Sequence, residues 1–318
     1  MPEKSVEAIG GYFGLELRSG VAWHSDAVAL NSGRNALRYL LLEPLPAKVY
    51  VPWFTCTAVT EVITGLGIAI SRYHINEAME PLFELDTVAP NEVFLYTNYF
   101  GLKDSYVRTL ATRDCNIIID NAQSFFSPHV ASLSTFYSPR KFFGVPDGGY
   151  AYGSRLQPLE TDHSNTRTAH LMIRHDESAQ AGYAHYLANE NVVEGLPMRA
   201  MSALSARILQ SIDYASVAER RKSNFKKLHS VLGSSNSLPI EDDDERVALT
   251  YPYLSNDMQL SARLQAHCIF TATYWPDIAQ AVKNTTVEYR YCTQLVHLPI
   301  DQRYGEAHME QILDKVLA

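Results

Sequence analysis

The stretch Asn-Ile-Ile-Ile-Asp-Asn-Ala-Gln at residues 116–123 decides the fold class. Three isoleucines in a row, bounded by polar residues, are typical of a short strand buried on both faces. Asp120 stands at the end of this strand, where open α/β sheets bind their ligands. A lone aspartate at such a position is more often a cap or turn residue. Asp120 is therefore a candidate whose role depends on what else lies nearby.

Further short apolar runs occur on both sides of this strand, and each is ended by polar or turn residues. They are Lys48–Pro52, Ile68–Ile75, Val93–Tyr96, Ser134–Tyr137 and Gly149–Tyr152. Helical periodicity separates the early runs, and one helix begins near Asn31 with Ser32 as its N-cap. The pattern predicts an α/β fold with a mostly parallel sheet and crossover helices.

The second half of the chain predicts a long helix and then a smaller α+β unit. Apolar residues recur every three or four positions from about Ala200 to about Leu232, and a polar loop follows. Expected beyond it are strands at Val247–Tyr253, Cys268–Tyr274 and Leu295–Pro299 and a closing helix from Glu306. We predict a large domain over 1–235 and a small domain over 236–318. Residues 1–20, rich in glycine and aromatic residues, are expected to form a packed arm.

Composition excludes several classes of protein. Of the 318 residues, 46% are hydrophobic and 19% charged, as in globular chains. The formal net charge of −8 argues against nucleic acid or an anionic membrane as a partner. No apolar run approaches the ~20 residues of a membrane span, and the N-terminus has no signal-peptide apolar region. Dispersed cysteines and the histidine spacing predict a cytoplasmic protein with no metal site.

Three short segments together suit one cofactor, pyridoxal phosphate (PLP). This cofactor needs a lysine for a Schiff base, a carboxylate for its pyridine nitrogen and a helix N-terminus for its phosphate. Lys141 in Ser-Pro-Arg-Lys supplies the first and Asp120 the second. The start of the helix at Ser32-Gly33-Arg34 supplies the third. Taken singly, each segment has a commoner structural explanation, so their combination carries the prediction.

Six motifs in order extend this reading from about Ala29 to the C-terminus. They are SGRNAL (32–37), VPWFTCTAV (51–59), IIIDNAQ (117–123), KFFGVPDGG (141–149), Met201-Ser202 with Leu204, and LVHLPID (295–301). The set resembles that of the DegT/DnrJ-type PLP-dependent sugar aminotransferases, which have the type I aminotransferase fold. The resemblance implies that Lys141 forms the Schiff base and moves the proton, and that Asp120 pairs with the pyridinium. It also implies that Gln123 hydrogen-bonds the ring hydroxyl.

The resemblance places the cofactor's phosphate at the start of the first helix. The residues expected to hold it are Ser32, Gly33, Arg34 and Ser138. Ser138 is chosen because Phe136 occupies the position of the family's phosphate-binding serine; Thr135 is the other available hydroxyl. An asparagine that the partner subunit lends in the family aligns with Met198, and the neighbouring Arg199 is a substitute for it.

The ring-stacking residue also departs from the family pattern. The family's aromatic falls at Cys56. We therefore expect Phe54, or else Trp53, to stack on the cofactor ring, unless the ring packs on an aliphatic wall.

The resemblance implies transamination from an amino-acid donor, glutamate, to a keto sugar attached to a nucleotide. It also implies a homodimer with the site at the subunit interface. A PLP-dependent sugar dehydratase is a competing activity, but dehydrating relatives can have histidine at the position of Lys141. The altered phosphate contacts leave open a non-catalytic protein that binds PLP or a sugar nucleotide. A dinucleotide-dependent oxidoreductase would need a Gly-x-Gly-x-x-Gly motif, which the sequence lacks.

Overall fold

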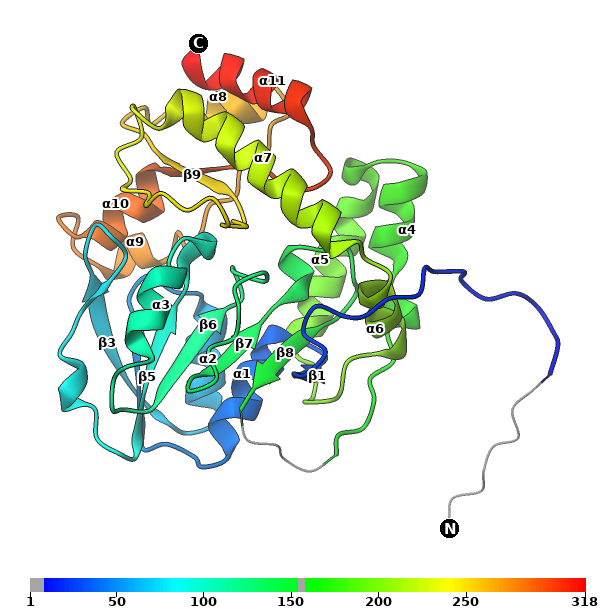
Figure 1. Cartoon of the computed structure of the whole chain (residues 1–318), viewed down its shortest axis with the longest axis horizontal. Coiled ribbons are helices and arrows are strands. Elements are labelled where there is room, and N and C mark those ends of the chain that lie inside the picture. The colour runs from blue at the N-terminus through cyan, green and yellow to red at the C-terminus, as the bar shows by residue number, and fades with distance from the viewer. Residues whose placement is uncertain (1–8, 154–157) are drawn as a thin grey trace.

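The computed structural model describes residues 9–153 and 158–318 (Figure 1). Within them, eight strands form one sheet in the order β1-β8-β7-β6-β5-β2-β3-β4. The pairs β3/β2, β2/β5, β5/β6 and β6/β7 are parallel, whereas β8 is antiparallel to both of its neighbours and β4 to β3. The strands are β1 (Val28–Leu30), β2 (Lys48–Pro52), β3 (Ala69–Ile75), β4 (Pro81–Leu82), β5 (Glu92–Thr97), β6 (Ile117–Asn121), β7 (Ser134–Tyr137) and β8 (Gly149–Tyr152). This mostly parallel sheet confirms the predicted α/β class.

Helices cover the sheet and build the rest of the molecule. Those that follow or precede sheet strands are α1 (Gly33–Leu42), α2 (Thr57–Gly65), α3 (Asp104–Leu110), α4 (Ala169–Asp176), α5 (Ala179–Glu194) and α6 (Ala203–Gln210). The later ones are α7 (Tyr214–Leu232), α8 (Leu260–Ala266), α9 (Ile278–Ala281), α10 (Val287–Gln294) and α11 (Glu306–Leu317). No helix in the described ranges is long and apolar enough to cross a membrane.

The isoleucines of β6 show how the sheet separates two hydrophobic clusters. Ile118 faces the cluster formed with α1 and α2, whereas Ile117 and Ile119 face the opposite one. Successive side chains of a strand point to opposite faces, so a central strand with clusters on both sides must be apolar throughout. All five residues of β6 are buried. Asp120 is therefore buried at the carboxyl end of this strand.

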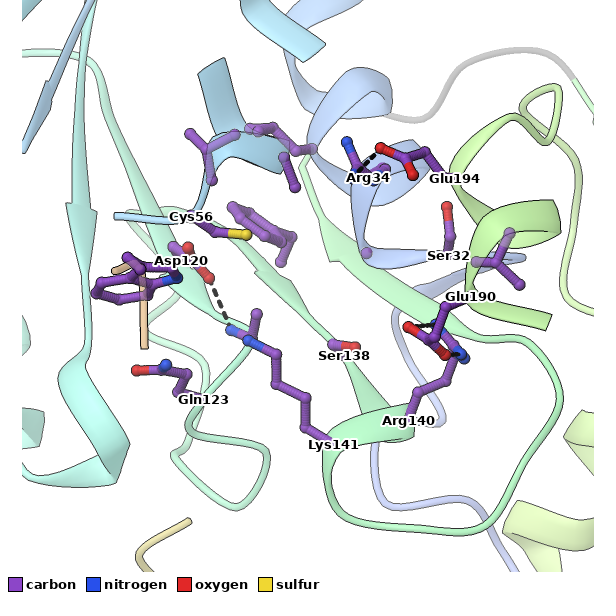
Figure 2. Close-up of a pocket in the computed structure, with 18 residues that line it drawn as sticks. Ser32, Arg34, Cys56, Asp120, Gln123, Ser138, Arg140, Lys141, Glu190 and Glu194 are labelled. Atoms are coloured by element: carbon purple, nitrogen blue, oxygen red, sulfur yellow. Dashed lines mark hydrogen bonds and ion pairs between the residues drawn. The ribbon is translucent and has the colours of Figure 1, made fainter. Parts of the chain in front are cut away.

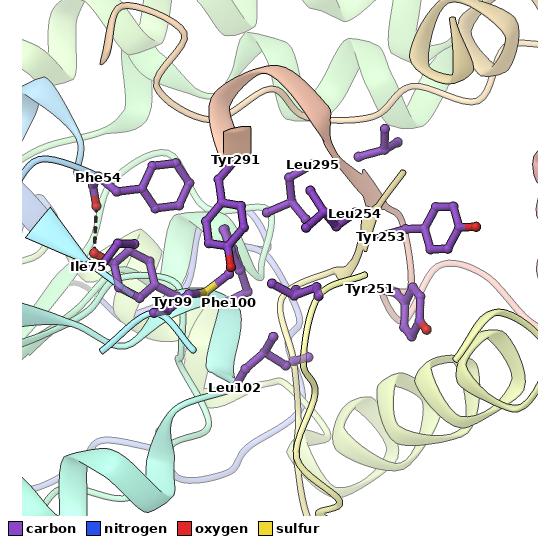
Figure 3. Close-up of a cluster of buried hydrophobic side chains, with 14 of the residues drawn as sticks. Phe54, Ile75, Tyr99, Phe100, Leu102, Tyr251, Tyr253, Leu254, Tyr291 and Leu295 are labelled. Carbon is purple, nitrogen blue, oxygen red and sulfur yellow. Dashed lines mark hydrogen bonds between the residues drawn. The ribbon is translucent and has the colours of Figure 1, made fainter. Parts of the chain in front are cut away.

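A second, two-stranded sheet is formed near the C-terminus by β9 (Tyr251–Leu254) and β10 (Leu295–Leu298). Figure 3 shows aromatic residues of the large sheet's loops, Phe54 and Tyr99, in one cluster with Tyr251 and Tyr291 from this region. Figure 1 shows α7 running from the large sheet to the β9 region. The division at residue 235 stays a prediction.

The long helix predicted over residues 200–232 is wrong. The structure has two helices, α6 and α7, because the Asp213 side chain accepts a hydrogen bond from the Ser216 N–H (3.1 Å) and starts a new helix there. The apolar period continues across this break, so periodicity alone did not show it. The closing helix from Glu306 is confirmed as α11.

Two further predictions need correction. Cys268–Tyr274 is not a strand: in the described residues it makes one isolated bridge, between Ala272 and His297, and Cys268 has a left-handed φ of 59°. Near residue 17 the expected arm does contact the protein, because the Leu17 carbonyl accepts a hydrogen bond from Arg207 of α6. The packed arm is wrong for residues 9–15, where the side chains of Tyr12 and Phe13 are 97% and 93% exposed. Figure 1 shows this segment leading away from the molecule. Residues 1–8 of the expected arm lie outside the described residues.

Candidate active site

Most of the predicted site residues line one cavity of about 350 Å³ beside the carboxyl end of β6 (Figure 2). These residues come from three separate parts of the chain, and they are Ser32, Gly33, Arg34, Asp120, Gln123, Ser138 and Lys141. Nonpolar side chains complete the wall, among them Leu37, Val59, Phe136 and Trp275. The fold therefore brings seven of the eight candidates together, and Phe54 is the exception.

Asp120 is a buried carboxylate at the strand end, with 5% of the residue exposed. Its Oδ1 accepts a hydrogen bond from the Ala122 N–H at 2.8 Å. Burial raises the pKa of Asp120, and the positive charge of Lys141 and the bond from Ala122 offset this only in part. A buried carboxylate in this position is poised to accept a further cationic partner from the cavity.

Lys141 reaches the same cavity from the neighbouring strand. It closes a short 3-10 turn, η3 (Pro139–Lys141), that follows β7 directly. Pro139 fixes the backbone at the start of this turn, and the Phe142 N–H bonds to the Pro139 carbonyl at 3.0 Å. Figure 2 shows the extended lysine side chain running past Ser138 toward Asp120. The amine and the carboxylate thus approach one ligand volume from two adjacent strands.

The N-terminus of α1 forms another wall of the cavity. Ser32 is the N-cap, and its Oγ accepts a hydrogen bond from the Asn35 N–H at 3.1 Å. Gly148 and Gly149 make the close approach of this turn to β8 possible. A Cβ on Gly149 would lie 2.2 Å from the Ser32 carbonyl oxygen, and Gly148 has a φ of +142°. The glycine pair therefore positions free backbone N–H groups at the cavity, where they favour an anion.

Gln123 provides a test of whether PLP fits this cavity. The residue is 1% exposed, and its Oε1 accepts a hydrogen bond from the Phe100 N–H at 3.3 Å. Its Nε2 is buried without a partner in the described part of the chain. A buried amide normally has its donors satisfied, so a ligand acceptor is missing here. Together with a buried carboxylate and an amine, this unpartnered donor fits a pyridine ring that carries a hydroxyl group.

Three comparisons place this geometry among known proteins. No protein-family model matches the sequence, and no curated protein matches it. Solved structures do match. A DegT DnrJ EryC1 StrS aminotransferase from Brucella abortus is 17% identical with a TM-score of 0.61, covering 92% of this chain and 85% of its own. The chain shares the fold of this aminotransferase. CalS13, a sugar aminotransferase from Micromonospora echinospora, is 14% identical with a TM-score of 0.64, covering 92% and 87%. NtdA from Bacillus subtilis, solved with bound cofactor PMP, is 16% identical with a TM-score of 0.62, covering 92% and 73%.

Within this aminotransferase fold, Phe54 does not line the cavity, so its predicted stacking role is not supported. It is fully buried and packs against Trp275, with ring centroids 4.6 Å apart and an interplanar angle of 80°. Trp275 itself reaches the cavity, as does Cys56. Trp53, the other aromatic considered, instead packs against Arg72, whose guanidinium carbon is 4.7 Å from the ring centroid. The sequence motif located the segment but not which of its side chains faces inward.

Of the residues predicted to replace the family's phosphate-binding side chains, some line the cavity and others do not. Ser138 lines the cavity, whereas the Thr135 hydroxyl donates to the Leu133 carbonyl at 3.3 Å. Met198 packs against a hydrophobic cluster, and Arg199 pairs with an exposed glutamate. Neither Met198 nor Arg199 lines this chain's cavity. Of these candidates, only Ser138 is placed to contact a ligand in the cavity.

Three charged residues that the sequence did not indicate also line the cavity, Arg140, Glu190 and Glu194. The two glutamates lie on α5, a helix that was not predicted. Ser178 caps this helix by accepting from the Ala181 N–H at 3.1 Å, and Gly195 follows its last residue. This serine and glycine at the two ends of an alanine-containing stretch are the signal that could have revealed α5.

In residues 9–153 and 158–318, no three His, Cys, Asp or Glu side chains gather closely enough to hold a metal ion. The cavity offers an amine, a buried carboxylate, an amide, a helix N-terminus and the guanidinium and carboxylate groups at its edge.

Proposed function

We propose that the protein is a PLP-dependent aminotransferase that converts a nucleotide-linked keto sugar into an amino sugar. One observation carries the proposal: Lys141, Asp120 and the N-terminus of α1 line one cavity in a sugar aminotransferase fold. The bound PMP in the structurally similar NtdA supports the choice of cofactor. The proposed donor is an amino acid, glutamate, and the proposed location is the cytoplasm.

PLP, when bound, supplies an electron sink that stabilises negative charge on the substrate carbon. Asp120 would hold the proton on the pyridine nitrogen. Burial raises the pKa of this carboxyl, and a protonated nitrogen beside it would offset the cost of burying the negative charge. Gln123 would donate its unpartnered Nε2–H to the ring hydroxyl. Ser32, Ser138 and the backbone N–H groups of Gly33 and Arg34 would hold the phosphate.

Lys141 has two tasks in this proposal. Its Nζ would be the covalent anchor for the cofactor aldehyde. When it is not bound in this way, Nζ would act as the base that moves the proton at the substrate carbon bearing the amino group. Acid–base work by one positioned group contributes about 10²–10⁴ to a rate. Because Lys141 performs both tasks, Lys141→Ala should abolish turnover.

The lining of a second cavity, of about 280 Å³, supports the proposal that the substrates are anions. Lys141 lines it too, so this space adjoins the reactive amine. Its cationic lining residues are Arg140, Lys141, Arg174, Arg221 and Arg303, and they outnumber the one acidic lining residue, Asp301, which pairs with Arg303. Both the carboxylates of glutamate and the diphosphate of a nucleotide sugar are anions that guanidinium groups bind well. We therefore place the two substrates on this side of Lys141.

The proposal includes a homodimer whose second subunit completes the site. The exposed segment at the N-terminus supports it: Ile9, Tyr12 and Phe13 are apolar side chains with almost full exposure in a single chain. A contiguous apolar segment of this kind is typical of a surface that another chain covers. Light scattering would measure the mass, and an active monomer in dilute solution would contradict this part of the proposal.

The absorption spectrum of protein loaded with PLP tests the proposed function. We expect a Schiff-base band that glutamate converts into the band of the aminated cofactor, with formation of 2-oxoglutarate. The Lys141→Ala variant should not show the first band. A band that persists unchanged with glutamate would refute this donor, and the absence of any band at saturating PLP would favour a non-catalytic protein.

A further inference from the structure

Two arginine–glutamate pairs flank the phosphate end of the cavity. Arg34 Nη2 lies 2.9 Å from Glu194 Oε1, and Arg140 forms an ion pair with Glu190. Arg34 also forms an ion pair with Glu61 of α2 through its other terminal nitrogen. Figure 2 shows both pairs on the side of the cavity where Ser32 and Ser138 lie, away from Asp120. The guanidinium groups are therefore at the edge of the volume in which the serines and the α1 N-terminus would hold an anion.

Both carboxylates belong to one face of α5 near its C-terminal end. Glu190 and Glu194 are four positions apart, so their side chains lie on the same side of the helix. Asn189 anchors this end of α5 by donating its Nδ2–H to the Pro146 carbonyl at 3.0 Å. Negative charge is unfavourable at a helix C-terminus, because the helix dipole is negative there. The two glutamates therefore depend on the arginines for favourable partners.

The arginines are also more firmly placed than the carboxylates that contact them. The exposed fractions of the side chains are 26% for Arg34 and 15% for Arg140, against 53% for Glu61, 37% for Glu190 and 54% for Glu194. Arg140 also has a buried Nε without a partner in the described residues. The carboxylates can thus turn toward solvent while the guanidinium groups stay at the cavity wall.

We propose that the side chains of Arg34 and Arg140 bind the phosphate of PLP, and that Glu190 and Glu194 compete with it for them. This inference rests on the proposed function for the identity of the phosphate compound. We call Glu190 and Glu194 the acidic latch. A phosphate dianion accepts two guanidinium groups through charge-assisted, often bidentate hydrogen bonds, whereas partly exposed ion pairs are weak. The phosphate therefore replaces the carboxylates of the acidic latch as the hydrogen-bond partner of both arginines.

The two arginines also compensate for polar side chains that are missing at the phosphate end of the cavity. Phe136 is at the cavity in place of a hydroxyl, and Met198 is packed in a hydrophobic cluster. Two guanidinium groups supply more donors and more positive charge than the side chains that these positions no longer provide. With the latch closed, however, three glutamates face two arginines, which leaves a net negative charge near the phosphate site. Opening the latch restores the positive charge.

Binding of inorganic phosphate and of PLP tests the acidic latch without relying on activity. Dissociation constants would be measured by calorimetry for inorganic phosphate, PLP and pyridoxal, which lacks the phosphate. The double variant Glu190→Gln/Glu194→Gln should bind inorganic phosphate and PLP about two- to fivefold more tightly for each pair opened. Arg34→Gln and Arg140→Gln should each weaken both by about tenfold or more. Pyridoxal binding should change in neither case.

A matched control separates the latch from a general change of charge. Glu306→Gln/Glu310→Gln removes the same charge from α11, where both residues pair with Lys227. We expect it to leave the three dissociation constants unchanged. Phosphate binding that is equally tight in wild type and latch variant, or no tighter than in the α11 control, would overturn the proposal. If PLP binds but glutamate reacts with neither the wild type nor any variant, the proposed function is refuted. The titrations with inorganic phosphate would still show whether Glu190 and Glu194 compete with phosphate for the arginines.

Discussion

Replacing Gly149 with alanine tests the close contact between β8 and the start of α1. The added Cβ would lie 2.2 Å from the Ser32 carbonyl oxygen, 2.5 Å from its carbon and 2.9 Å from the Gly33 nitrogen. All three atoms belong to the backbone, so no side chain can rotate away to make room. Overpacking of this kind costs about 1–3 kcal/mol. We expect Gly149→Ala to lower the free energy of unfolding by at least the upper part of that range.

The assay is urea unfolding followed by circular dichroism, together with the dissociation constant for PLP. Moving the Ser32 turn displaces the N–H groups at the cavity, so the affinity for PLP should fall as well. Gly65→Ala is the control: it lies at the end of α2, where a Cβ meets nothing within 4 Å. That change should stabilise the protein by up to about 1 kcal/mol. A Gly149→Ala protein as stable as the wild type, with unchanged PLP affinity, would refute the contact.

Three more outcomes follow from buried polar groups. Asp120→Asn should raise the urea midpoint of the cofactor-free protein at pH 7, because burial raises the pKa of Asp120 and the charged form therefore opposes folding; the same variant should lose most of its activity. Arg221→Met should cost about 1–3 kcal/mol in urea unfolding, since the carbonyls of Ala248 and Leu249 lose a buried donor. Burial lowers the pKa of His24 to about 4, below its unfolded value near 6.5. Stability should therefore be lost as the pH falls from about 6.5 toward 4, and His24→Gln should make this loss shallower; an unchanged slope would argue against the burial of His24.

The strands of the large sheet were predictable because their signal is local. Lys48–Pro52, Ser134–Tyr137 and Gly149–Tyr152 occur as predicted, and the isoleucine run of β6 is buried on both faces. Parallel strands end at one edge of a sheet, so Asp120 and Lys141 had to approach each other once that sheet was assumed. Glycine is required at position 149 because β8 passes directly against the backbone of Ser32.

What sequence reasoning missed depends on contacts between distant segments. Phe54 was expected to face the cavity, but it packs against Trp275, which reaches the cavity from the C-terminal third of the chain. The glutamates of α5 approach Arg34 and Arg140 through tertiary packing that no local pattern encodes. Periodicity likewise could not show the break between α6 and α7, since apolar spacing continues through it.

The most direct test of the account is to identify the residue that PLP modifies. The protein would be incubated with PLP, reduced with borohydride, digested and sequenced by mass spectrometry. The account predicts one modified peptide carrying the label on Lys141, and no label on that peptide in the Lys141→Ala variant. Labelling of other lysines with Lys141 unmodified would contradict the central claim that this cavity binds PLP through Lys141.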